Sequence, residues 1–72
     1  MNPTVRLHRK LYSKTAIDAA KAAFEHLADI SVVRDTDWYK VEFVDPDPDV
    51  QEVIAHEFAN FALAEVVESV KK

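Results

Sequence analysis

The sequence predicts an α+β fold, a two-layer β-α-β-β-α sandwich in which a three-stranded sheet of order 1-3-2 carries two helices on one face. Three observations predict it: a period-2 pattern near the amino end, two stretches with helical spacing, and two β-branched and aromatic segments separated by an aspartate-containing turn. A right-handed crossover followed by a hairpin places the third strand between the first two. A chain of 72 residues has room for one such core, so residues 1–72 are expected to form a single small domain.

The first strand is expected over Thr4 to Tyr12, where apolar and polar residues alternate. Ser13 then stands at the position of a helix N-cap, and the first helix is expected at about Lys14 to Ala28. Alternation turns one side of the strand toward the helices: Val5, Leu7 and Leu11. It turns the other side away from them: Arg6, His8, Lys10 and Tyr12.

A hairpin is expected from Ile30 to Val44, with Asp35-Thr36-Asp37 as its turn. The chain contains no glycine, so we expect its turns to be made at negative φ. The second hairpin strand has an inner face of Tyr39, Val41 and Phe43. Its outer face carries Trp38, Lys40, Glu42 and Val44.

The run from Asp45 to Asp49 is expected to close this strand and to open the second helix, with Asp47 as N-cap and Pro48 at the first helical position. The helix is expected to reach about Val70 and to pack one apolar stripe on the sheet. A second stripe widens the apolar arc toward the carboxyl end, where either a partner or the chain's own sheet would cover it. This second stripe comprises Ala59, Leu63, Val66, Val67 and Val70.

Composition removes several kinds of chemistry. Without glycine the phosphate-binding loops G-x-x-x-x-G-K-[ST] and G-x-G-x-x-G are excluded, and without cysteine so are thiolate zinc sites and iron–sulfur clusters. The segment His56 to Asn60 lacks the second histidine of a zinc-binding H-E-x-x-H motif, and the aspartates from Asp45 to Asp49 lack the glycine of a calcium loop. We therefore expect no catalytic, cofactor or metal site and no enzymatic activity.

Charge is unevenly distributed along the chain. Nine basic and thirteen acidic residues give a net charge of −4, yet the first fourteen residues hold four bases and no acid. The apolar runs are only a few residues long, so we expect a soluble, cytoplasmic protein without membrane contact.

The uncovered face of the predicted sheet is the main candidate site. Aromatic and basic side chains there suit a protein or peptide partner, because Trp, Tyr and Arg are common anchors of interfaces. A nucleic acid could stack on the same residues, although the net acidic charge disfavours it. Homodimerisation through the second apolar stripe is a third possibility. The candidate face comprises Arg6, His8, Lys10, Tyr12, Trp38 and Lys40.

Two segments resemble a known family. The run from Glu57 to Leu63 has the form E-F-x-N-x-x-L, and Tyr12 to Ala20 has the form Y-S-x-x-A-I-x-x-A. Together they resemble the HxsD family of His-Xaa-Ser system proteins, over nearly the whole chain from Val5 to Glu68. The resemblance implies a small accessory protein beside radical-SAM enzymes that modify a peptide with His-Xaa-Ser repeats. We expect Asn60, the polar residue within that helix motif, to bond a backbone group where helix and sheet meet.

Overall fold

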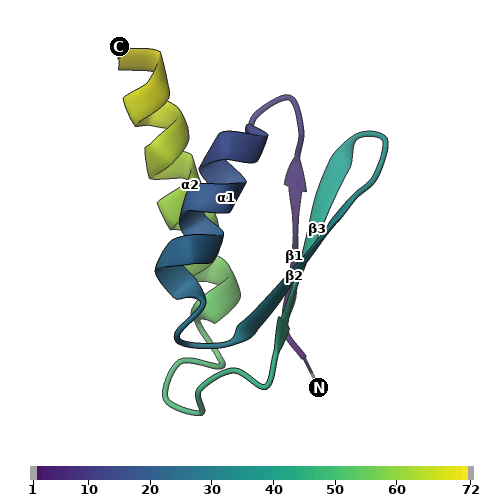
Figure 1. Ribbon diagram of the computed structural model, residues 1–72, viewed down its shortest axis with the longest axis vertical. Coiled ribbons are helices and arrows are strands. Elements are labelled where there is room, and N and C mark those ends of the chain that lie inside the picture. The colour runs from purple at the N-terminus through teal and green to yellow at the C-terminus, as the bar shows by residue number, and fades with distance from the viewer. Residues whose placement is uncertain (1, 72) are drawn as a thin grey trace.

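The fold is the α+β sandwich that the sequence predicts. A computed structural model describes residues 2–71, with side chains described for residues 2–68. Its elements, in chain order, are β1 (Thr4–His8), α1 (Lys14–Phe24), β2 (Asp29–Arg34), β3 (Trp38–Val44) and α2 (Ile54–Lys71). The strand order is β1-β3-β2 with both pairings antiparallel, and the two helices share one face of the sheet (Figure 1).

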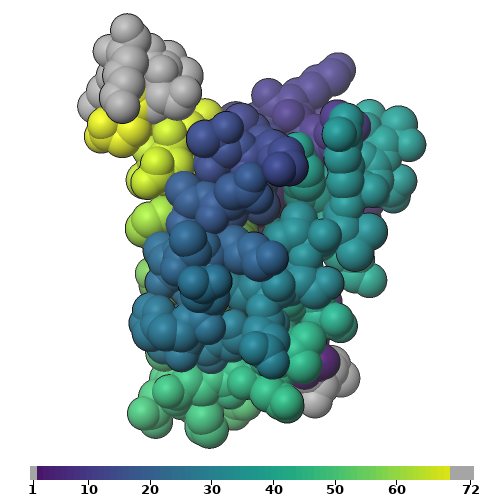
Figure 2. All heavy atoms as spheres, viewed as in Figure 1, coloured from purple at the N-terminus to yellow at the C-terminus, as the bar shows by residue number. Residues whose placement is uncertain are grey.

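The core lies between this sheet and the two helices. The inner face of β3 is buried as expected, and Leu7 joins it from β1. Phe58 of α2 stands edge-on to Phe24 of α1 and to Phe43 of β3, with ring centroids 5.6 and 5.3 Å apart. Such contacts add about 0.5–1.5 kcal/mol each beyond the area that they bury. The Phe58 ring therefore joins both helices to the sheet, and Figure 2 shows α1 and the β2–β3 hairpin in contact on the near side.

The first strand is shorter than the sequence pattern suggests. It ends at His8, whose carbonyl oxygen accepts hydrogen bonds from the amides of Leu11 and Tyr12 at 3.0 and 2.9 Å. The chain turns there, so alternation no longer decides which way a side chain points. Leu11, expected inside, is 53% exposed, and Tyr12, expected on the uncovered face, packs against the core. Lys10 lies exposed in the turn, outside the sheet.

Both helices differ in length from expectation. α1 starts at Lys14 with Ser13 as its N-cap, because the Ser13 hydroxyl accepts a hydrogen bond from the Ala16 amide at 3.1 Å. This cap confirms the predicted start, but the helix ends at Phe24. The chain from there to β2 forms a turn that ends in the buried Ala28.

α2 begins later than the proline and aspartate signals indicate. Residues 48–53 form successive turns, and the bond from the Ile54 amide to the Val50 carbonyl, at 2.8 Å, leads into the helix. Asp47 is not its N-cap. The Asp47 carboxylate instead accepts from the Asp49 amide at 2.9 Å, and the Asp47 amide donates to the Leu27 carbonyl at 2.7 Å. The acidic run is therefore a loop that is hydrogen-bonded to the turn after α1.

One turn also departs from the expected backbone geometry. Asp45 has φ of 48°, in the left-handed region. Aspartate occupies this region more readily than most residues because its short polar side chain can bond locally. Positive φ thus occurs in this chain without glycine, directly after β3.

Candidate functional site

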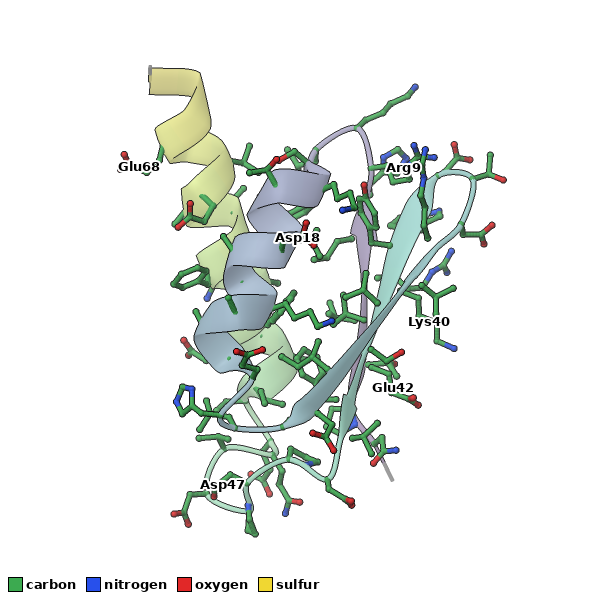
Figure 3. All side chains as sticks on the ribbon, in the orientation of Figure 1. Arg9, Asp18, Lys40, Glu42, Asp47 and Glu68 are labelled. Atoms are coloured by element: carbon green, nitrogen blue, oxygen red, sulfur yellow. The ribbon has the colours of Figure 1, made fainter. Side chains whose placement is uncertain are left out.

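The sheet presents one face that neither helix covers. We call this surface the open face. It lies opposite the helices in Figure 3, where Lys40 and Glu42 are labelled on it. Strand register identifies its residues, because residues directly opposite one another in paired strands point to the same side. Its principal members are Thr4, Arg6, His8, Ser31, Val33, Trp38, Lys40 and Glu42.

Trp38 is the aromatic centre of the open face. It lies opposite His8, and the two rings meet edge-on with centroids 4.8 Å apart. The Arg6 guanidinium carbon lies 4.6 Å from the centroid of the Trp38 ring, within the range of a cation–π contact. His8 is held in addition through its ring, because Nδ1 accepts a hydrogen bond from the Lys10 amide at 3.1 Å. These contacts fix three side chains in one arrangement.

Arg6 of this cluster also faces a second cation across the sheet. Arg6 lies directly opposite Lys40, and both side chains are exposed. Like charges at directly opposed positions destabilise a sheet. Among the described side chains the one ion pair is Lys14 with Asp18 on α1, so neither Arg6 nor Lys40 has a carboxylate within 4.0 Å. Glu42, the nearest acid along β3, stands opposite Thr4 instead.

The outer edge of β1 is the second feature of the site. The Phe43 amide bonds to the Pro3 carbonyl at 3.0 Å, and the Arg9 amide to the Asp37 carbonyl at 2.9 Å. In an antiparallel pair such bonds alternate along the strand, so the odd-numbered residues of β1 bond β3 and the even-numbered ones point their backbone groups outward. Because β1 is at the edge of the sheet, these groups meet no further strand among the described residues.

A flank of α2 lies above this edge. Phe61 contacts Phe24 of α1 with ring centroids 5.7 Å apart, so its side of α2 faces α1. Each helical residue advances by about 100°, which turns Leu63 about 200° away from Phe61. In Figure 1, α1 and β2 lie nearer the viewer while α2 and β1 lie behind them, so this side of α2 is on the β1 side. We call it the outer flank, formed by Ala59, Leu63 and Val66.

The outer flank is incompletely covered. Leu63 is 39% exposed, and Val67, turned further toward solvent, is 45% exposed. Ala59 and Val66 are half-buried. Val70, also expected in this stripe, has its side chain outside the described residues.

The structure brings together only part of the predicted surface. Arg6, His8, Trp38 and Lys40 form one contiguous group on the open face. Lys10 and Tyr12 do not belong to it, because the strand ends before them. Asn60 is exposed on α2, and its side chain takes part in none of the hydrogen bonds of the described residues. The prediction that it bonds a backbone group at the helix–sheet junction is therefore wrong.

Two residues of this region were missed by sequence reasoning. Val33, 57% exposed, stands opposite Lys40 and adds an apolar side chain to the open face. Alternation within β2 could have found it, since Ile30 and Val32 pack against the core. Arg9, which looks like an interruption of an apolar pattern, instead bonds the β2–β3 loop, and no local signal indicates that contact.

A depression with a volume of about 340 Å³ lies at the other end of the molecule, where the loop after α1 meets the loop after β3. Its wide opening would leave a substrate poorly enclosed, and its lining is largely acidic. Among the described residues, no group of three or more His, Cys, Asp or Glu side chains is arranged to hold a metal ion. The lining residues are Glu25, His26, Leu27, Ala28, Asp29, Asp45 and Asp47.

Within the described part of the chain, neither helix combines the length and the apolar character that crossing a membrane requires. Comparison of the chain with protein-family models, with curated proteins and with solved structures gave no match in any of the three.

Proposed function

We propose that this protein is a non-enzymatic accessory module that binds a protein or peptide partner at the open face and the adjoining edge of β1. The observation that carries this proposal is the directly opposed pair of Arg6 and Lys40, exposed beside Trp38 and without an acidic partner among the described side chains. An anionic group from a partner would relieve their repulsion. Trp38 and Val33 would supply apolar contact next to it, as at the centre of many interfaces.

The resemblance to the HxsD family suggests the biological setting. We propose that the partner is the peptide of a radical-SAM maturation system, or one of the enzymes that modify it. The chain contains no cysteine to hold an iron–sulfur cluster, so in that setting its contribution is binding rather than the radical chemistry itself.

The test is a titration of isotope-labelled protein, followed by amide chemical shifts. The probes are a synthetic peptide of His-Xaa-Ser repeats and, separately, the radical-SAM enzymes of such a system. We expect shifts concentrated at Arg6, Trp38 and Lys40, and weaker binding by the Lys40→Glu variant. Lys21→Glu is the matched control, because it makes the same change of charge at an exposed position of α1, away from the open face. Unchanged amide shifts with every probe would contradict the proposal.

Nucleic-acid binding is the second candidate function, supported by the contact of Arg6 with Trp38 beside Lys40. Single-stranded nucleic acids bind where cations accompany an aromatic ring on which bases stack. The guanidinium already occupies one side of the Trp38 ring, so a base would stack on the other side. Such binding would weaken steeply with salt and with Trp38→Ala. A mixed-sequence oligonucleotide that does not bind at low salt would exclude this function.

Homodimerisation is the third candidate, supported by the exposure of Leu63 and Val67. If α2 pairs with a second α2 through these residues, Leu63→Asp and Val67→Asp should each lower the solution mass measured by light scattering. The same monomeric mass for both variants and for the unmodified protein would exclude a dimer of this kind.

A further inference from the structure

We infer that the outer edge of β1 accepts an extended strand from a partner polypeptide in which apolar and acidic residues alternate. The strand would lie beside β1 in the plane of the sheet, with its apolar side chains beneath the outer flank of α2 and its acidic ones on the open face. This inference rests on the proposed binding function and specifies its site and the chemistry of the ligand.

The backbone of β1 has hydrogen-bonding groups that point outward along the edge of the sheet. Thr4 and Arg6 each direct an amide and a carbonyl outward, by the alternation established above. His8 directs its amide outward, while its carbonyl already accepts from Leu11 and Tyr12. A strand added to an edge gains its affinity from such main-chain groups and its selectivity from the side chains that alternate along it. β1 therefore offers a run of five outward backbone groups.

The outer flank of α2, above the edge, determines the polarity of the side chains on one side of the added strand. Side chains of the new strand that lie level with Val5 and Leu7 would point toward the helices, because neighbouring residues in a sheet share a face. They would meet the outer flank, where Leu63 is 39% exposed and Ala59 and Val66 are half-buried. Apolar side chains at these positions would extend the core sideways and cover surface that the described residues leave in contact with water.

Charge decides what the other side must be. Side chains level with Thr4, Arg6 and His8 would lie on the open face beside Arg6, with Lys40 one strand further away on β3, about 10 Å from the added strand. Neither cation has an acidic partner among the described side chains. Glutamate or aspartate at these positions would supply Arg6 with a countercharge and so offset its repulsion by Lys40, whereas lysine would add a third cation beside the pair.

Charge complementarity favours a different polypeptide over a second copy of this strand. A second β1 would bring Thr4, Arg6 and His8 to the open face, and none of these is acidic. Charge complementarity would then be absent even if the backbone bonds formed.

The experiment supplies the strand in cis, which raises its effective concentration and removes dependence on a weak free peptide. α2 ends at the same end of the molecule as His8 (Figure 1), so a strand placed after it through a short polar linker can run antiparallel to β1. Three versions are appended after Lys72: Val-Glu-Val-Glu-Val-Glu-Val, the same strand with lysine for every glutamate, and the glutamate strand with proline at its centre. Proline removes an amide needed for the ladder.

We expect the glutamate strand to slow amide hydrogen exchange at Thr4, Arg6 and His8 by about tenfold or more relative to the unextended protein. The lysine and proline strands should protect these amides much less. In the Arg6→Glu variant, the lysine strand should protect the amides of residues 4, 6 and 8 more than the glutamate strand does. Equal protection by the glutamate and lysine strands would overturn the acidic preference, and no protection by any strand would overturn addition at β1.

Failure here is distinguishable from failure of the proposed function. If the partner titration shifts amides on the open face while the glutamate strand leaves β1 unprotected, binding exists but does not use the β1 edge, and this inference is wrong. Light scattering identifies any extended chain whose strand pairs with β1 of another copy. In that arrangement the same three amides would still be protected, which supports the inference.

Discussion

The guanidinium of Arg9 donates a 2.6 Å hydrogen bond to the carbonyl oxygen of Thr36, which lies 27 positions away in the sequence. The Arg9 amide bonds the Asp37 carbonyl at 2.9 Å, and the guanidinium carbon lies 6.0 Å from the centroid of the Tyr39 ring. One residue of the turn after β1 thus binds the β2–β3 loop by its backbone and by its side chain. It holds β1 in register with β3 at the end of the sheet that carries His8 and Trp38.

Arg9→Ala is expected to destabilise the protein by about 1 kcal/mol, below the roughly 1.5–3 kcal/mol typical of hydrogen bonds to charged groups, because this bond is exposed. Urea denaturation followed by circular dichroism measures the loss, and amide exchange at Asp35 should accelerate. Arg9→Lys keeps the charge but loses the planar fork, so it should fall between wild type and alanine. Lys10→Ala, in the same turn, should change neither quantity; a loss equal to that of Arg9→Ala would show that the turn matters but the guanidinium does not.

Lys40→Glu is expected to raise stability while it weakens partner binding. The change turns the like-charge pair of Arg6 and residue 40 into a pair of opposite charges, which should raise the free energy of unfolding by about 1 kcal/mol at low salt. The gain should shrink at high salt, because both side chains are exposed. Thermal unfolding at two salt concentrations measures it. Lys21→Glu, which removes a base from the last turn of α1, should not stabilise the protein; equal gains in both variants would point to net charge alone.

Phe58→Leu is expected to cost about 1–2 kcal/mol, because the smaller side chain cannot keep the edge-on contacts with Phe24 and Phe43. Phe58→Ala should cost about 3–5 kcal/mol, which approaches the whole stability of a domain this small. Phe61→Leu is the matched control, since Phe61 contacts Phe24 from a half-buried position. Urea midpoints should rank Phe61→Leu above Phe58→Leu, and the reverse order would contradict the assigned core.

Asp45→Gly is expected to stabilise the protein by about 0.5 kcal/mol, because glycine adopts positive φ without steric cost. We expect this relief of strain to exceed the larger conformational entropy that glycine loses on folding. Asp45→Val should destabilise it, since a β-branched residue fits φ of 48° poorly. Asp37→Gly serves as the control, because Asp37 has negative φ. Among the described residues, only Asp45 has positive φ. If Asp37→Gly and Asp45→Gly changed the urea midpoint alike, backbone strain at Asp45 would be ruled out.

Local signals were enough to predict the fold. Ser13 marks the start of α1 through a bond to the amide three residues on, and the alternation of Tyr39, Val41 and Phe43 marks the buried face of β3. Signals that act within a few residues are readable from sequence because the physical contact itself is local. Strand order followed from the handedness of the crossover, which is a general property of twisted sheets.

Boundaries and contacts set by distant residues could not be predicted in the same way. The turn at Arg9 and Lys10 contains no glycine, proline or asparagine, so the end of β1 is marked only by Arg9, which interrupts the apolar side of the alternating pattern. Asp47 and Pro48 look like the start of a helix, yet the bond from the Asp47 amide to Leu27 keeps this segment in a loop.

The candidate site likewise has one part that the sequence predicts and one part that it does not. Alternation placed Arg6, His8, Trp38 and Lys40 on one face, and the structure keeps them there. The repulsive pairing of Arg6 with Lys40 depends on register between strands that are distant in sequence, and the flank of α2 above β1 depends on how a helix sits on the sheet. Neither is encoded in the spacing of nearby residues.

From the position of β1 in the chain we expect a particular order of folding. β2 and β3 are joined by Asp35, Thr36 and Asp37, so their pairing closes a short loop, whereas β1 meets β3 only after α1 and β2 have intervened. Closing the longer loop costs more entropy, and contacts of that kind form late in folding. We therefore expect β1 to dock last, so that a substitution such as Val5→Ala raises the rate of unfolding and leaves the rate of folding nearly unchanged in stopped-flow measurements.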